Sequence, residues 1–239
     1  MWHLPPKQLS VSSSEVHIWR VLIDRPTLPV EQLAKMLSAD ELTRAERFYF
    51  ERDRNRFIVA RAALRTILGS YLGVAAKQVQ FCYGHRGKPA LAPIQAKSGL
   101  EFNLSHSGEV AVCAVTRDRD IGIDVEFIRP ITEAEQIAKR YFSVRENASF
   151  QALPNSEKQA GFFYHWTRKE AHLKAEGEGL SANSDRFDTS VAMEEAKMLE
   201  SSDRTCNRWF LQEFTPAPNY IATVAVEGKG WNLTYWQYQ

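Results

Sequence analysis

Near its middle the chain reads Ile121-Gly122-Ile123-Asp124-Val125-Glu126-Phe127, and the rest of the fold can be inferred around this segment. Branched apolar residues alternate here with other residue types, which is typical of a β-strand whose side chains point to opposite faces in turn. Asp124 and Glu126 therefore share one face. Because an unpaired carboxylate beside a core is costly, the sequence predicts that a cation accompanies these two acids.

A later stretch predicts a helix that carries a third acid, and it reads Trp166-Thr167-Arg168-Lys169-Glu170-Ala171-His172-Leu173-Lys174. Residues four apart lie on one side of a helix, so Glu170 and Lys174 point the same way. Three carboxylates and a nearby lysine suit a Mg²⁺ ion that holds a phosphate-bearing substrate. Taken alone, each motif also fits a simpler alternative, namely solvated acids on a strand or a helix-stabilising Glu–Lys pair.

Composition narrows the class of protein. The chain has 239 residues, of which 44% are hydrophobic and 25% charged, as in an ordinary globular protein. A net charge of +1 argues against a nucleic-acid substrate. No apolar run is long enough to predict a membrane span or a signal peptide. Three widely separated cysteines form neither a disulfide framework nor a zinc site, which favours a reducing, cytoplasmic setting.

Periodicity and glycine or proline boundaries predict further elements around these two stretches. Helices are expected over residues 30–37, 57–72, 133–142, 143–153 and 158–176, with another starting at Ser38, where Glu41 completes a capping box. Strands are expected over residues 16–23, 78–83, 110–115, 187–193, 208–214, 220–226 and 231–238. Both halves have a long helix followed by strands, so the sequence predicts an α+β fold of two similar subdomains, residues 1–118 and 119–239.

Two polar turns precede the acidic strand, Gly84-His85-Arg86-Gly87-Lys88-Pro89 and Asn103-Leu104-Ser105-His106-Ser107. Cationic side chains, hydroxyls and open backbone N–H groups are suited to binding phosphate. The alternatives are a solvated β-turn and a polar hairpin turn. Arg61 and Arg65 share one side of the helix over 57–72, where they are either further phosphate contacts or a solvated helix face.

These four motifs, in this order, resemble those of a 4′-phosphopantetheinyl transferase of the surfactin-synthetase type. That family pairs a G-[I/V]-D-[I/V]-E strand with a W-[S/T]-x-K-E-[A/S]-x-x-K helix, matched here by residues 122–126 and 166–174. Its G-K-P and N-[I/L]-S-H-S turns are matched by residues 87–89 and 103–107. The resemblance covers about residues 18–226. It implies two pseudo-symmetric α/β subdomains with the active site, and coenzyme A, at their interface in a monomer.

The resemblance also implies an activity, that of a holo-acyl-carrier-protein synthase type enzyme. Such a transferase moves the phosphopantetheine arm of coenzyme A to a serine of an apo carrier protein and releases adenosine 3′,5′-bisphosphate. Mg²⁺ is the implied cofactor, held by Asp124, Glu126 and Glu170. Glu170 is expected to take the serine proton, directly or through a water, and Lys174 to contact the transferring phosphate. Contacts to coenzyme A are expected from Arg61, Arg86, Lys88, Ser105, His106, Lys169 and Lys174.

The partner is expected to be an acyl, peptidyl or aryl carrier protein, without a further choice among pathways. The segment 137–150, with its basic and aromatic residues, is the expected docking surface, and an ordinary amphipathic helix is the alternative. One departure from the family concerns the adenine end of coenzyme A. The family often has basic residues near position 41, whereas this chain has Glu41, so Arg44 and Arg47 are expected to substitute.

Two other functions remain open at this stage. A D-x-E strand with an E-x-x-x-K helix could also serve a metal-dependent phosphodiesterase. The same fold could instead be a binding module for carrier proteins without catalysis, although that would require damage to the acidic residues.

Overall fold

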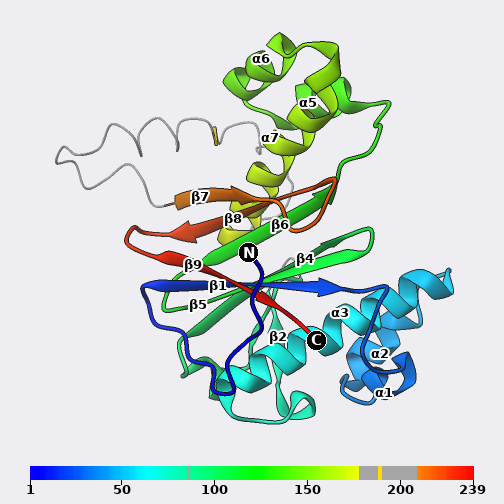
Figure 1. The fold of residues 1–239 in the computed structure, drawn as a ribbon, viewed down its shortest axis with the longest axis vertical. Coiled ribbons are helices and arrows are strands. Elements are labelled where there is room, and N and C mark those ends of the chain that lie inside the picture. Colours follow the sequence, from blue (N-terminus) through cyan, green and yellow to red (C-terminus); the bar gives the residue numbers. More distant parts are fainter. Residues whose placement is uncertain (85–86, 178–187, 190–208) are drawn as a thin grey trace. The chain divides into compact units, whose positions relative to one another are not determined.

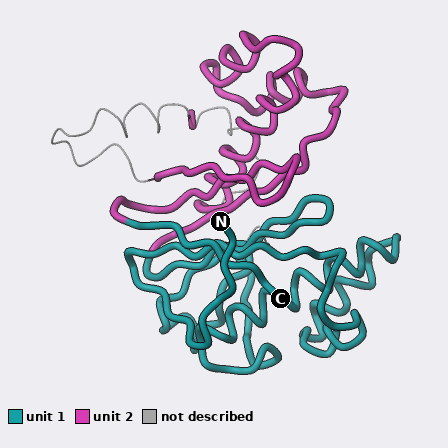
Figure 2. Tube along the Cα trace, in the orientation of Figure 1, with its two compact units in different colours: residues 1–118, 231–239 teal, residues 119–230 magenta. Residues whose placement is uncertain are grey.

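The structure is a computed structural model that describes residues 1–84, 87–177, 188–189 and 209–239. The chain divides into two compact units (Figure 2). Unit 1 contains residues 1–118 and 231–239, and unit 2 contains residues 119–230. This division differs from the expected subdomains at the C-terminus, because residues 231–239 belong to unit 1. The reason is that strand β9 (Asn232–Gln237) pairs in parallel with strand β1 (Glu15–Leu22).

Unit 1 is built on a four-stranded sheet in the order β4-β5-β1-β9 (Figure 1). Strand β4 (Leu100–Ser107) and β1 both pair antiparallel with β5 (Val110–Arg117). Strands β2 (Phe81–Tyr83) and β3 (Pro89–Leu91) form a separate hairpin. The helical elements are α1 (Val30–Ala34), α2 (Ala39–Ala45), α3 (Glu51–Leu72), the 3-10 turn η1 (Ala76–Gln78) and α4 (Pro93–Ala96).

Helix α3 forms the centre of the unit 1 core. Its apolar residues, including Leu64 and Leu68, join one hydrophobic cluster with Trp19 of β1 and Cys113 of β5. The helix ends at Gly73, whose φ of 67° is left-handed and therefore suits glycine. Cys113 is fully buried, and burial raises the pKa of its thiol.

In the part of unit 2 that the structure describes, a three-stranded antiparallel sheet is combined with three helices. The sheet has the order β6-β8-β7, formed by β6 (Ile121–Phe127), β8 (Tyr220–Glu227) and β7 (Trp209–Phe214). The helices are α5 (Ala134–Tyr141), α6 (Val144–Ala152) and α7 (Asn155–Glu176). The long helix α7 packs on β6 and β8 (Figure 1). It follows Pro154 and stops at Gly177, so it begins three residues before the expected helix over 158–176 and ends where that helix ends.

An aromatic cluster holds α5 and α6 against the N-terminal half of α7. Phe142, Phe150, Phe162 and Phe163 are all buried in it. The ring of Trp166 stacks on that of Phe162, with centroids 5.8 Å apart. Stacked and edge-to-face pairs of this kind are worth more than the apolar area that they bury, so the cluster helps to hold α5 and α6 on this half of α7.

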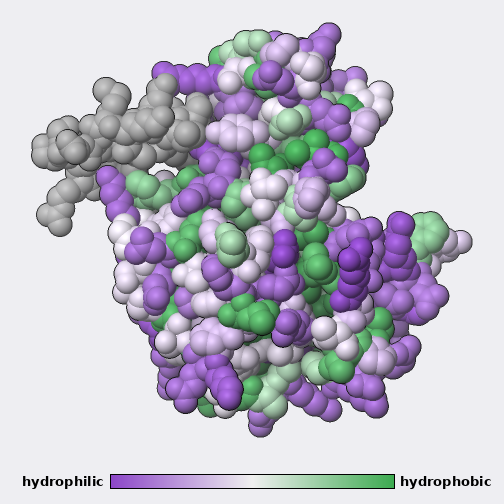
Figure 3. Space-filling view, in the orientation of Figure 1, coloured by the Kyte–Doolittle hydropathy of each residue, from purple (hydrophilic) through white to green (hydrophobic). Residues whose placement is uncertain are grey.

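Several expected elements have different bounds in the structure. Helix α1 spans Val30–Ala34 rather than 30–37, and β2 spans Phe81–Tyr83 rather than 78–83. The expected strand over 187–193 lies outside the described residues, apart from 188 and 189, which form no strand. Within the described residues, none of the helices has the length and hydropathy needed to cross a bilayer. Hydrophilic side chains cover much of the face seen in Figure 3.

Candidate active site

The acids of β6 point toward helix α7. Alternation along the strand places Gly122, Asp124 and Glu126 on one face. A Cβ added to Gly122 would lie 2.9 Å from Ala175 Cα and closer still to the backbone oxygen of Ala171, both on α7. Only glycine permits so close an approach of strand and helix. The strand therefore brings Asp124 and Glu126 against the helix that carries Glu170 and Lys174.

Lys174 joins the two elements directly. Its Nζ donates a hydrogen bond to Oδ1 of Asp124 over 2.6 Å, and the Asp124 side chain is buried. The sequence predicts that Lys174 accompanies Glu170 on the helix, whereas the structure pairs it with the strand acid. Charge-assisted bonds of this length are among the stronger polar contacts in proteins.

Glu170 lies close enough to both strand acids to be affected by their charges. Burial raises the pKa of Glu170, Lys174 opposes the rise, and the charges of Asp124 and Glu126 add to it, so that the pKa reaches about 7. Oε1 of Glu170 is buried and makes no hydrogen bond within the described residues. A buried carboxylate oxygen without a partner is costly, which indicates that the site accepts a cation or a proton there.

The preceding residues of α7 fix the rotation of this helix. Thr167 Oγ1 lies 3.0 Å from Thr223 Oγ1, and both side chains are fully buried. Thr223 is opposite Asp124 in the sheet register, so its side chain lies on the same face. Arg168 forms an ion pair with Glu213, which is opposite Thr223 on the other side. One row of the sheet therefore makes three polar contacts with α7.

Lys169 forms a buried ion pair that the sequence analysis missed. Its Nζ lies 2.9 Å from Oε2 of Glu146, and both side chains are fully buried. Glu146 also accepts hydrogen bonds from the backbone nitrogens of Ser143 and Thr189. The observed contact of Lys169 is thus with an acid of α6. The S-x-x-E capping pattern at Ser143 is the sequence signal that could have indicated Glu146.

The acids have the chemistry of a Mg²⁺ site. Asp124, Glu126 and Glu170 supply the hard oxygen donors that Mg²⁺ prefers, and the unpartnered oxygen of Glu170 fits a cation. Among the described residues, no three His, Cys, Asp or Glu side chains are grouped closely enough to hold a metal as they stand. A metal bound by these acids would therefore draw their side chains closer together.

The expected phosphate-binding residues outside unit 2 lie in three parts of unit 1. Lys88 follows Gly87 in the β2–β3 turn, where Gly87 has a φ of 78°. Ser105 and His106 were expected in a turn, but they lie inside β4, opposite Val112 and Ala111 of β5. Alternation along the strand therefore separates them, so that Ser105 is buried and His106 is exposed. Arg86 lies outside the described residues.

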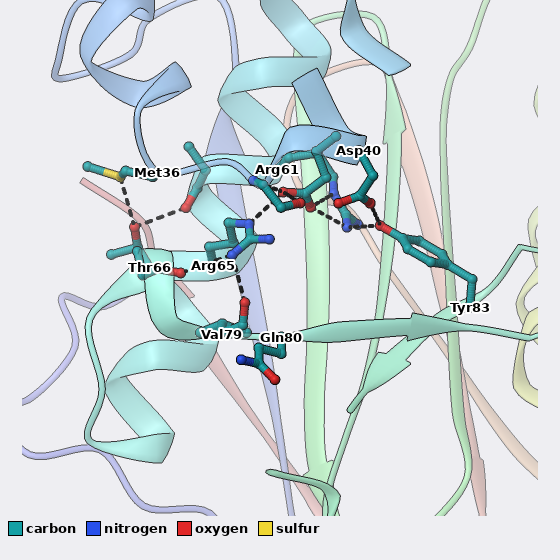
Figure 4. A network of polar contacts seen from close by, with 12 residues as sticks. Met36, Asp40, Arg61, Arg65, Thr66, Val79, Gln80 and Tyr83 are labelled. Carbon is teal, nitrogen blue, oxygen red and sulfur yellow. Dashed lines mark hydrogen bonds and ion pairs between the residues drawn. The ribbon is translucent and has the colours of Figure 1, made fainter. Parts of the chain in front are cut away.

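Arg61 belongs to a buried network around Glu41, shown in Figure 4. Its Nε donates to Oε1 of Glu41 over 2.8 Å, and its Nη2 donates to the hydroxyl of Tyr83 over 3.0 Å. Arg65 donates to the other oxygen of Glu41 and to the backbone oxygen of Val79. Burial would raise the pKa of Glu41, but the arginine charges and the Ser38 backbone bond outweigh it, so this pKa is lowered. The prediction of a solvated helix face is therefore wrong for Arg61 and Arg65, because both side chains are buried.

Comparison with known proteins decides the family. A 4′-phosphopantetheinyl transferase superfamily model matches residues 120–225, and a 4′-phosphopantetheinyl transferase N-terminal model matches residues 26–118. The 4′-phosphopantetheinyl transferase HetI of Nostoc sp. is 46% identical over 99% of this chain and 98% of its own length. The chain belongs to the 4′-phosphopantetheinyl transferase superfamily. The transferase Sfp of Bacillus subtilis is 29% identical over 88% of this chain and 87% of its own.

The two family models match the two units of this transferase separately. The N-terminal model ends at residue 118, the last residue of the first segment of unit 1, and the superfamily model covers both β6 and α7. The superfamily model therefore covers the whole acidic cluster, by which we mean Asp124, Glu126, Glu170 and Lys174.

The segment 137–150, which was expected to form the docking surface, is only partly exposed. Phe142 and Phe150 are buried in the aromatic cluster of unit 2, so they are not available to a partner. Lys139, Arg140 and Arg145 are exposed. The buried apolar residues of this segment belong to the core, as expected of an ordinary amphipathic helix, whereas Val144 is exposed.

Proposed function

We propose that this transferase is of the surfactin-synthetase type and moves the 4′-phosphopantetheine arm of coenzyme A to a serine hydroxyl of an apo carrier protein. The serine oxygen bonds to the phosphorus next to pantetheine, the bond to the adenylate-side phosphate breaks, and adenosine 3′,5′-bisphosphate leaves. The observation that carries the proposal is the meeting of Asp124, Glu170 and Lys174 between β6 and α7. The family models and relatives are transferases, which favours transfer over a phosphodiesterase reaction.

In this proposal Asp124, Glu126 and Glu170 hold Mg²⁺. When bound, the ion supplies positive charge that stabilises the negative charge developing on the diphosphate. The support is the oxygen-donor set and the unpartnered Oε1 of Glu170. By holding the ion, the acids would place its positive charge beside the substrate phosphates.

Glu170 is the proposed acceptor of the serine proton, directly or through a water. In the metal-free protein its pKa is about 7, which is suited to a general base near neutral pH. A carboxylate that binds a cation is less basic, so the choice between direct and water-mediated transfer depends on which oxygen faces the serine. Lys174 is proposed to contact the transferring phosphate and to stabilise the charge that develops on it.

The remaining proposed contacts to coenzyme A come from Arg61, Arg86, Lys88, Ser105 and His106. Cationic and hydroxyl groups recognise phosphate oxygens through charge-assisted hydrogen bonds. Lys169 is proposed to support the site through Glu146, because its ammonium group is buried against that acid. We further propose that the enzyme is a monomer. We also propose that it is cytoplasmic, in keeping with Cys82 and Cys113 as free thiols.

A transfer assay tests the proposed function. The wild-type protein is incubated with an apo carrier protein, a fluorescent coenzyme A analogue and Mg²⁺, and the label on the carrier is measured. We expect labelling that disappears with EDTA, or with a carrier whose acceptor serine is replaced by alanine. If the label stays on coenzyme A while the protein hydrolyses an oligonucleotide, the phosphodiesterase alternative is correct instead.

A further inference from the structure

Lys174 and a bound metal would compete for the same carboxylate. In the structure, the Nζ of Lys174 is 2.6 Å from Oδ1 of Asp124, and this side chain is 28% exposed while that of Asp124 is 5% exposed. Asp124 is one of the three acids proposed to hold the metal. An ammonium group and a divalent cation repel one another, so both cannot bind this oxygen at full strength.

Lys174 is well placed to change partners. It lies one helical turn beyond Glu170 in the last turn of α7, on a long flexible stem whose end is partly exposed. The three acids are not grouped closely enough for metal binding in this structure, whereas Glu170 Oε1 is buried without a hydrogen-bond partner among the described residues. The structure thus pairs Asp124 with an ammonium group close to an acid that has a buried, unbonded oxygen.

We propose that Lys174 exchanges Asp124 for the diphosphate of coenzyme A, so that the metal and coenzyme A bind cooperatively. Lys174 neutralises Asp124 in the free protein and weakens metal binding there. When a diphosphate is present, Lys174 turns to its oxygens and leaves Asp124 to the cation. The identity of the diphosphate as coenzyme A rests on the proposed function. By linkage, the metal must strengthen coenzyme A binding by the same factor.

Titration calorimetry with Mn²⁺ measures this coupling without catalysis. Metal-free wild-type protein is titrated with and without saturating coenzyme A, in the absence of a carrier protein so that no transfer occurs. We expect coenzyme A to tighten Mn²⁺ binding by at least about tenfold, equivalent to about 1.4 kcal/mol. In Lys174→Met, Mn²⁺ alone is expected to bind more tightly than in wild type, and the coupling factor is expected to fall several-fold.

Two further variants separate the exchange from a general effect of charge. Lys158→Met removes another cation of unit 2, whose ammonium binds the backbone oxygens of Phe150 and Gln151, and should leave the coupling unchanged. Asp124→Asn should weaken Mn²⁺ binding both with and without coenzyme A. Thermal melting of each variant checks that it is folded, and Lys174→Arg, which keeps the charge, replaces any unfolded Lys174→Met and should retain coupling.

The proposal is overturned if Lys174→Met tightens Mn²⁺ binding equally with and without coenzyme A, since loss of charge alone would do that. It is also overturned if wild-type Mn²⁺ affinity does not respond to coenzyme A. A failure of the proposed function is distinguishable, because it would appear as absent carrier labelling by a wild-type protein whose Mn²⁺ and coenzyme A binding are still coupled.

Discussion

Among the single residues of the site, Glu170 has the environment most typical of a functional group. Its carboxylate is held near the acids of β6 by the surrounding helix, and one of its oxygens lacks a hydrogen bond within the described residues. Burial and the charges of Asp124 and Glu126 favour its protonated form, although Lys174 favours the ionised form. A perturbed carboxyl in this setting is typical of a catalytic or metal-binding group.

The raised pKa predicts a distinct pH dependence of stability for the metal-free protein. The folded-state pKa of about 7 lies above the ordinary value of 4.5, so the folded protein binds this proton more tightly than the unfolded chain. This tighter proton binding stabilises the folded state fully below about pH 4.5, and the stabilisation is lost as the pH rises through about 7. Glu170→Gln imitates the protonated form, so at pH 8 it should be more stable than wild type by on the order of 2 kcal/mol.

Urea unfolding in EDTA at pH 5 and pH 8 measures this difference. The difference in the free energy of unfolding between Glu170→Gln and wild type should increase from pH 5 to pH 8. Mg²⁺ should narrow it at pH 8, because a cation favours the ionised carboxylate. Identical pH profiles for the two proteins would show that Glu170 is not the group that titrates.

The residues of the acidic cluster could be predicted from sequence because their spacing follows directly from strand and helix periods. Alternation places Asp124 with Glu126, and the helical period places Glu170 with Lys174. The partners of Lys169 and Arg61 could not be predicted in this way. Glu146 and Glu41 come from other elements, and only the packing of those elements brings opposite charges together.

At the scale of elements, the contact of β6 with α7 determines whether the site exists. Gly122 lies where the two backbones approach most closely, so a methyl group there must push the helix away. We expect Gly122→Ala to lower the free energy of unfolding by about 2–4 kcal/mol and to reduce transfer activity with it. Chemical denaturation measures the free energy of unfolding.

Gly84→Ala is the matched control, because the nearest atom to an added Cβ is 3.8 Å away, at ordinary contact distance. Its free energy of unfolding should change by less than about 0.5 kcal/mol. Equal stability of Gly122→Ala and Gly84→Ala would mean that α7 does not pack closely on β6.

The buried pair of Glu146 and Lys169 should behave as a coupled unit between α6 and α7. Glu146→Gln leaves the buried ammonium of Lys169 without its opposite charge, which should cost about 3–5 kcal/mol. Adding Lys169→Met should recover part of this loss, as a thermodynamic double-mutant cycle would detect. Glu51→Gln, which removes an exposed partner of Arg54, should change stability by less than about 1 kcal/mol. Additive effects in the cycle would argue against the pairing.

The sequence predicts most elements but not all of their roles. Helices such as α3 and α7 have long apolar periods and clear glycine ends, so their presence and their C-terminal ends could be inferred. Both begin earlier than expected, at Glu51 rather than 57 and at Asn155 rather than 158. The Ser-His segment was misread as a turn, since polar residues in a strand interior resemble turn residues when the pairing with β5 is unknown. The sheet to which β9 belongs depends on its long-range parallel pairing with β1.

At the scale of the whole molecule, the chain matches its relative HetI over 99% of its length, and both units match transferase family models. Unit 2 contains all the acids proposed for the metal, whereas unit 1 contains most of the proposed contacts to coenzyme A. The strand and the helix that carry the acids both belong to unit 2.

The most direct test is the rate at which an apo carrier protein becomes modified at its serine, measured by intact-protein mass spectrometry for wild type, Asp124→Ala and Glu170→Ala. Circular dichroism and melting confirm that each variant is folded. We predict that each substitution lowers the rate by about a hundredfold or more while binding of the carrier is kept. Near wild-type rates in both folded variants would contradict the assignment of these acids to the reaction.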